Sequence, residues 1–178
     1  MVPSPAVGLL FAAMIAMPDA GGKSMLCLKH PDKFQDIDEF VWRFASEELL
    51  EAFRSKRAQD VCDIYRRTML THHHELDRTK LLLSHHPKDA EWLHIACVAR
   101  IKPSLLLFQR NLNECAKQAR SQLEAVTLAY LSFDPAEIYD SHADIEQRCL
   151  QLWAAWKDTC ARRINAARIW RTDGVGAY

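Results

Sequence analysis

Three side chains in one short segment have the types and the spacing of metal ligands: Glu91, His94 and Cys97. Residues three apart share one face of an α-helix, so a helix here would bring a carboxylate, an imidazole and a thiol together. A di-iron carboxylate bundle needs a second Glu-x-x-His motif on another helix, and the chain has none. The sequence therefore predicts no resident metal, and these three residues are the candidate set if one binds.

Arg67 and His72 lie five positions apart in a segment whose apolar pattern is helical. The six residues from Arg67 to His72 resemble the Arg-x4-6-His motif of HEPN ribonucleases, which are all-α proteins. The resemblance implies that His72 acts as general base and that Arg67 stabilises the phosphate charge in the transition state. Because it covers only six residues, a small HEPN-like helical ribonuclease is an alternative function rather than the preferred one.

The tripeptide Gly22-Lys23-Ser24 matches the end of the phosphate-binding pattern Gly-x4-Gly-Lys-Ser. The pattern requires glycine at position 17, where this chain has Met17. It also requires a long helix that begins at the phosphate groups, and Pro31 follows too soon for one. The sequence therefore predicts no phosphate-binding loop. Because it also lacks a Gly-x-Ser-x-Gly elbow and a dinucleotide-binding fingerprint, it predicts no cofactor.

Charged residues are balanced over the whole chain but separated along it. The 23 Lys and Arg residues equal the 23 Asp and Glu residues, which argues against a general nucleic-acid-binding protein, whose balance is normally basic. Residues 31–51 are acidic and residues 157–171 are basic. The basic segment offers candidate interaction residues for an acidic protein surface, and nucleic-acid binding through them is the second alternative function. These residues are Arg162, Arg163, Arg168 and Arg171.

The distribution of glycine predicts the elements that position these residues. The five glycines occupy positions 8, 21, 22, 174 and 176, so residues 23–173 contain none. Hairpins and tight strand-to-helix turns use residues that tolerate positive φ, chiefly Gly and Asn, and the chain has only three Asn residues. Long helices need few such turns. A β-rich or doubly wound α/β fold is therefore not expected.

Apolar residues at steps of three and four indicate about five helices. The longest stripe covers residues 135–170, a second covers 105–130, and shorter ones cover 37–44, 46–68 and 92–99. The two longest helices would each have about 30 residues and a length of about 45 Å. Long helices with short connections predict an all-α antiparallel bundle.

The N-terminal segment differs in composition from the rest of the chain. Residues 6–17 form an apolar run with one glycine. A secretory signal requires a positively charged segment before such a run, and no Lys or Arg precedes this one. The run is too short to cross a bilayer, so it is predicted to be a packed or partner-facing arm. The predicted organisation is an apolar arm or short helix with a linker (1–30), one helical-bundle domain (31–172) and a flexible tail (173–178).

The six cysteines predict a reduced protein. Cys115, Cys149 and Cys160 fall on apolar stripes, where free Cys packs as a small hydrophobe, and no Cys-x-x-Cys pair indicates zinc. A cytoplasmic location follows. Because the sequence shows no catalytic constellation, the preferred function is a non-catalytic helical protein-binding module, namely an adaptor, an inhibitor or a subunit of an assembly. Its expected partner is another protein or a second copy of the chain.

Overall fold

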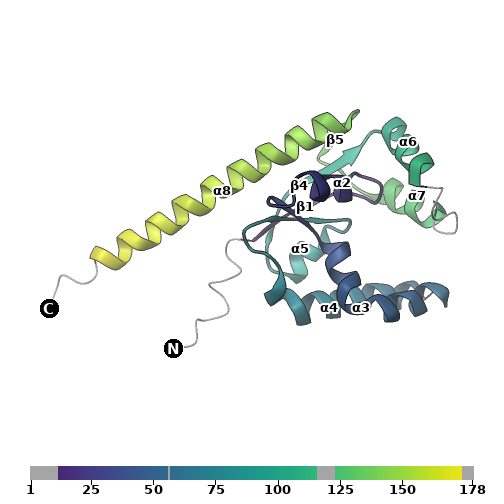
Figure 1. Ribbon diagram of the computed structural model, residues 1–178, viewed down its shortest axis with the longest axis horizontal. Helices are drawn as coiled ribbons and strands as arrows, with labels where there is room; N and C mark the ends of the chain where they lie inside the picture. Colours follow the sequence, from purple (N-terminus) through teal and green to yellow (C-terminus); the bar gives the residue numbers. More distant parts are fainter. Residues whose placement is uncertain (1–11, 56, 116–122, 174–178) are drawn as a thin grey trace.

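The computed structural model describes residues 12–55, 57–115 and 123–173, and these residues form an α/β fold (Figure 1). Five parallel strands make one sheet in the order β2-β3-β1-β4-β5. The all-α antiparallel bundle predicted from the sequence is therefore wrong. The strands are β1 (Ala13–Ala16), β2 (Phe34–Asp36), β3 (Leu81–Ser84), β4 (Ala96–Pro103) and β5 (Glu137–Tyr139).

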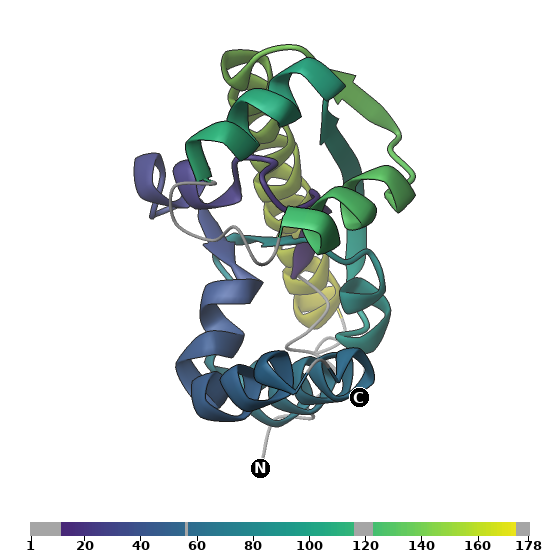
Figure 2. The same ribbon diagram turned by 90° about the vertical axis from the view of Figure 1, so that its right-hand side faces the viewer.

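Seven α-helices and one 3₁₀ turn connect and flank the strands in the described part of the chain. Helices α3 and α4 lie side by side at one end of the molecule, and the C-terminal half of α8 runs beyond the sheet (Figures 1 and 2). No described helix is both long and apolar enough to cross a bilayer. The helices are α2 (Lys23–Lys29), α3 (Ile37–Arg54), α4 (Ala58–His72), α5 (Lys88–Trp92), α6 (Leu105–Cys115), α7 (Leu123–Ser132) and α8 (His142–Asp173), with the 3₁₀ turn at His73–Glu75.

Helices cover both faces of the sheet, as in a doubly wound fold. Met14 and Leu82 belong to a core cluster with buried residues of α3, α4 and α5. Ile15 and Leu83, their neighbours along the strands, belong to a second cluster with α2, α6 and α8. Because β1 and β3 are buried on both faces, their sequences are continuous apolar runs rather than alternating ones. For this reason the search for alternating or helical periodicity did not predict β1 and β3.

The interior of the chain turns almost without glycine. Among the described residues, positive φ occurs at Ala20 (57°), Gly22 (97°) and His94 (53°). Only one of these is glycine. Parallel strands are connected by helical crossovers rather than by hairpins, so few left-handed residues are needed. The inference from scarce glycine to an all-α fold was wrong for this reason.

Several predicted elements occupy other places. Residues 13–30 are assigned above to an arm and linker. In the structure they contain β1, the central strand of the sheet, and α2, which packs beside the sheet. The stripe predicted over 135–170 is divided between β5 and α8, and α8 alone has 32 residues. Its buried residues Ile145, Cys149 and Trp156 confirm the predicted apolar stripe in this part of the helix, whereas Ile138 in β5 and Ile164 in α8 are exposed. The predicted helix over 105–130 contains α6 and α7, and residues 116–122 between them lie outside the described part.

Candidate functional site

The loop after β1, residues 17–22, occupies the centre of one edge of the sheet; we call it the β1 loop. Strands β2 and β3 lie on one side of β1, and β4 and β5 lie on the other. The chain therefore crosses over β1 between β3 and β4, which makes the carboxyl end of β1 a topological switch point. In open α/β sheets, ligands bind outside the carboxyl ends of the strands at such a point.

Lys23, the first residue of α2, places a buried ammonium group beside the β1 loop. Its side chain is 6% exposed, and its Nζ lies 3.4 Å from Asp19 Oδ1 and 3.2 Å from Asp38 Oδ2. Burial opposes the charge, but Asp38, Asp19 and Asp36 together hold the pKa of Lys23 above its ordinary value. The side chain is therefore an ammonium cation enclosed by carboxylates from the loop after β1 and from the first turn of α3.

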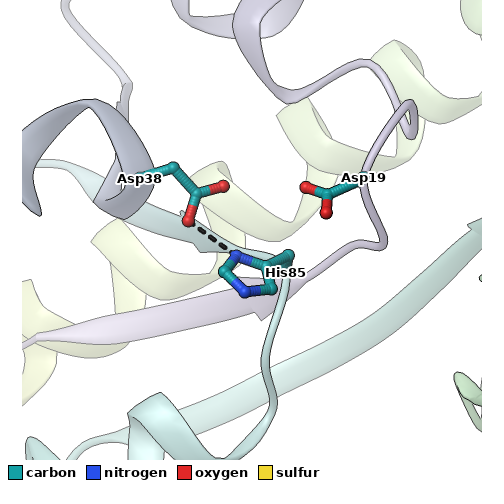
Figure 3. Close-up of side chains that lie close together, drawn as sticks. All are labelled: Asp19, Asp38 and His85. Atoms are coloured by element: carbon teal, nitrogen blue, oxygen red, sulfur yellow. Dashed lines mark hydrogen bonds and ion pairs between the residues drawn. The ribbon is translucent and has the colours of Figure 1, made fainter. Parts of the chain in front are cut away.

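Asp38 also binds His85, the residue that follows β3 (Figure 3). His85 Nδ1 lies 2.6 Å from Asp38 Oδ1. Burial opposes protonation of His85, but its hydrogen bond to Asp38 raises the pKa of the imidazole to about 9. Burial would raise the pKa of Asp38, whereas His85 and Lys23 lower it to about 2. At neutral pH the pair is therefore an imidazolium and a carboxylate.

Two further carboxyl groups lie near these charges. Asp36 ends β2 and accepts a hydrogen bond from the backbone N–H of Asp38 at 2.9 Å. Burial and the charge of Asp38 raise the pKa of Asp36 to about 6. Asp89 on α5 is 1% exposed and accepts a hydrogen bond from the Ser84 hydroxyl, and burial raises its pKa to about 6. The β2–β3 side of the site is thus rich in carboxyl groups.

Residues after β4 and β5 hold the β1 loop from its other side. Asn111 on α6 donates a hydrogen bond from Nδ2 to the carbonyl oxygen of Ala20 at 2.6 Å. Its Oδ1 lies 2.8 Å from Nε2 of His142, the first residue of α8. A Cβ on Gly22 would lie 3.3 Å from the His142 ring. The segment that follows each of the five strands therefore contributes a residue to this loop, to its charged neighbours or to the contacts that hold it.

The two glycines of the β1 loop have separate structural reasons. The N–H of Gly21 donates to the carbonyl oxygen of Pro18 at 3.0 Å, and a Cβ on Gly21 would lie 2.6 Å from that same oxygen. Gly22 has a φ of 97°, in the left-handed region that favours glycine. The loop conformation therefore depends on both glycines.

The sequence Gly22-Lys23-Ser24 thus lies between a central parallel strand and a helix, the context that a phosphate-binding loop requires. From the sequence alone, Met17 and Pro31 argue against this motif. Met17 is fully buried in the core, and its N–H donates to the carbonyl oxygen of Ser84 at 2.8 Å. Helix α2 has seven residues and ends at Lys29, two positions before Pro31, so it is short, as the position of Pro31 indicated. The motif was identified in the sequence, but the strand before it was not.

Arg67 and His72, the candidate ribonuclease residues, both lie on α4 and have other neighbours. Arg67 is an exposed residue paired with Glu48. The ring of His72 stacks on Phe44 with 4.0 Å between the ring centroids. The all-α scaffold that the HEPN resemblance implies is not the fold of the described residues.

Glu91, His94 and Cys97 do not share a helical face. Helix α5 contains Glu91 but ends at Trp92, His94 has a φ of 53°, and Cys97 lies in β4. The predicted helical spacing was therefore wrong. Within the described ranges, one group of three metal-ligating side chains has its ligand atoms within 4.8 Å of one another, and it is Asp19, Asp38 and His85.

The four candidate interaction arginines lie on α8, away from the β1 loop. Arg162 is exposed and pairs with Asp158 at 3.1 Å, and Arg163 is exposed. The side chains of Arg168 and Arg171 lie outside the described residues.

No family model, curated protein or solved structure matches the chain significantly. The function is therefore derived from the geometry of the site.

Proposed function

We propose that the protein binds the phosphate groups of a polyphosphate ligand, such as a nucleoside triphosphate, at the β1 loop. The observation that carries this proposal is the position of Gly22-Lys23-Ser24 between the central strand and the next helix, at the switch point of a parallel sheet. Lys23 supplies the cation, and the two glycines allow the loop to turn directly before α2.

The ammonium of Lys23 is suited to this role because its position is fixed by two carboxylates, while it has three N–H donors. An ammonium group has three N–H donors, and Asp19 and Asp38 are its two carboxylate partners in the structure. His85 adds a second positive charge one contact away, through Asp38. A phosphate oxygen that replaces or joins these carboxylates would gain a charge-assisted hydrogen bond in a half-buried site.

Replacing Lys23 with glutamine is expected to weaken binding of pyrophosphate or ATP at least tenfold, because the variant keeps hydrogen-bonding capacity but loses the charge. Isothermal titration calorimetry on the full chain measures this effect. Lys157→Gln is the matched control, since Lys157 is exposed on α8, and it should bind like the unchanged protein. Equal affinity of the Lys23→Gln variant and the unchanged protein would refute the proposal.

The non-catalytic protein-binding role predicted from the sequence is a second candidate function. It is favoured by the extension of α8 beyond the sheet (Figure 1), with Ile164 43% exposed next to Arg162 and Arg163. The predicted self-association and cytoplasmic location belong to this candidate and stay predictions.

If the extended part of α8 mediates self-association, reversing the charges of Arg162 and Arg163 to Glu should lower the mass measured by sedimentation at micromolar concentration. The paired substitution of Arg54 and Arg57, on the α3–α4 side, is the control of equal charge change. A monomeric mass for the unchanged protein at every concentration would remove self-association from the candidate functions.

A further inference from the structure

Three metal-ligating side chains from three separate segments of the chain lie close together beside Lys23. Asp19 belongs to the β1 loop, Asp38 follows β2 and His85 follows β3. Their ligand atoms lie within 4.8 Å of one another. Asp38 and Asp19 approach His85 from opposite sides (Figure 3). The group therefore depends on the tertiary fold, because Asp19 and His85 lie 66 positions apart in the sequence.

The charges of this group are matched only while Lys23 stays with the carboxylates. Asp19 and Asp38 are balanced by the ammonium of Lys23 and the imidazolium of His85. A phosphate ligand that attracts Lys23 would leave Asp19 and Asp38 beside its own negative charges. Like charges a few ångströms apart in a partly buried site repel strongly, since little water screens them. A polyphosphate alone would thus bring excess negative charge into the site.

A divalent cation lowers this repulsion because it places two positive charges between the carboxylates and the phosphate. His85 must release its proton to water before a ring nitrogen can coordinate the cation, so the site gains one positive charge in all. We infer that the polyphosphate ligand binds as its complex with a divalent cation, which Asp19, Asp38 and His85 coordinate while Lys23 holds a phosphate oxygen. This inference rests on the proposed function and extends it by naming the ligand as a metal–polyphosphate complex.

The donor set indicates the class of cation. Two carboxylate oxygens and one imidazole nitrogen are a mixed set, whereas Mg²⁺ and Ca²⁺ prefer oxygen ligands alone. Transition metals of the first row, including Mn²⁺, accept both donor types. The remaining coordination positions of the cation would be filled by phosphate oxygens and water. Mn²⁺ is therefore the appropriate probe.

The test compares binding of pyrophosphate in a chelating buffer with binding of the preformed Mn²⁺–pyrophosphate complex, by calorimetry on the full chain. The unchanged protein should bind the complex at least tenfold more tightly than pyrophosphate alone. Asp19→Asn and His85→Gln should each remove this difference, because each loses one ligand of the cation. Asp158→Asn, at an exposed carboxylate on α8, is the matched control and should retain it.

The cation site is refuted if Mn²⁺ leaves the affinity of the unchanged protein for pyrophosphate unaltered. It is also refuted if Asp19→Asn and His85→Gln keep the full effect of Mn²⁺. If pyrophosphate binds in a Lys23-dependent way with no effect of Mn²⁺, the proposed function stands and only the cation site fails. If pyrophosphate binds neither with nor without Mn²⁺, both fail.

A second measurement does not depend on the folding of variants. Electron paramagnetic resonance of Mn²⁺ counts the bound ion on the unchanged protein, with and without pyrophosphate. Binding couplings are reciprocal, so pyrophosphate should tighten Mn²⁺ binding by the same factor as Mn²⁺ tightens pyrophosphate binding. Retention of Mn²⁺ that is independent of pyrophosphate overturns the inference.

Discussion

Replacing Gly21 with alanine is expected to weaken pyrophosphate binding at least tenfold. The new Cβ would lie 2.6 Å from the carbonyl oxygen of Pro18, which is backbone and cannot rotate away. The turn closed by the hydrogen bond from Gly21 N–H to Pro18 must therefore open. Opening this turn displaces the β1 loop relative to Lys23, and calorimetry with pyrophosphate measures the result.

A substitution in the opposite sense in the same loop is the control. Ala20 has a φ of 57°, a conformation that costs a non-glycine residue about 1–2 kcal/mol. Ala20→Gly should therefore keep the affinity for pyrophosphate and should not lower the free energy of unfolding. Denaturation by urea monitors stability in both variants. Unchanged affinity in Gly21→Ala would show that the turn does not position the binding groups.

Asp89→Asn is expected to raise the free energy of unfolding at pH 7.5 by about 2–3 kcal/mol. Burial raises the pKa of the Asp89 carboxyl to about 6 in the folded protein, from 3.8 in the unfolded chain. The ionised carboxylate is thus more stable in the unfolded chain. Between about pH 4 and pH 6 the Asp89 carboxyl ionises in the unfolded chain but not in the folded protein. The free energy of unfolding of the unchanged protein therefore falls over this range and does not fall further above it. The asparagine variant has no charge to bury.

The gain from Asp89→Asn should vanish below pH 4, where the carboxyl is protonated in both states. The Oδ1 of asparagine can accept the hydrogen bond from the Ser84 hydroxyl, as the carboxyl oxygen of Asp89 does, so the local hydrogen bond is kept. Urea unfolding across pH 4–8 measures the difference. Asp158→Asn on α8 is the control and should stay within about 0.5 kcal/mol at every pH. Parallel pH profiles for Asp89→Asn and the unchanged protein would contradict the prediction.

The helical part of the fold was more predictable than the sheet. The apolar stripe that contains Cys149 and Trp156 has a period that only a helix produces, and both residues are buried in α8. Strand β1 has four residues and β2 and β5 have three each, which is too short for a period to be measured. Burial on both faces also removed the alternation that marks a half-exposed strand.

The candidate site could be predicted only in part. Gly22-Lys23-Ser24 was visible as a motif, and an apolar run ending at Met17, five positions before Gly22, was a usable signal for a strand. The partners of Lys23 were not predictable, because Asp38 and His85 lie 47 positions apart and meet only through the pairing of β2 with β3. Nothing in their local sequence distinguishes them from surface residues.

The scarcity of glycine affects the unfolded chain as well as the folded one. At average usage, the 151 residues between positions 23 and 173 would contain roughly ten glycines. Each glycine replaced by another residue in a compatible conformation narrows the denatured ensemble, a gain of about 0.4–1 kcal/mol. Within that range His94 has a left-handed φ of 53°, a conformation that destabilises the folded state at a non-glycine residue. The scarcity of glycine therefore contributes to the free energy of unfolding through the restricted denatured chain rather than through contacts in the folded protein.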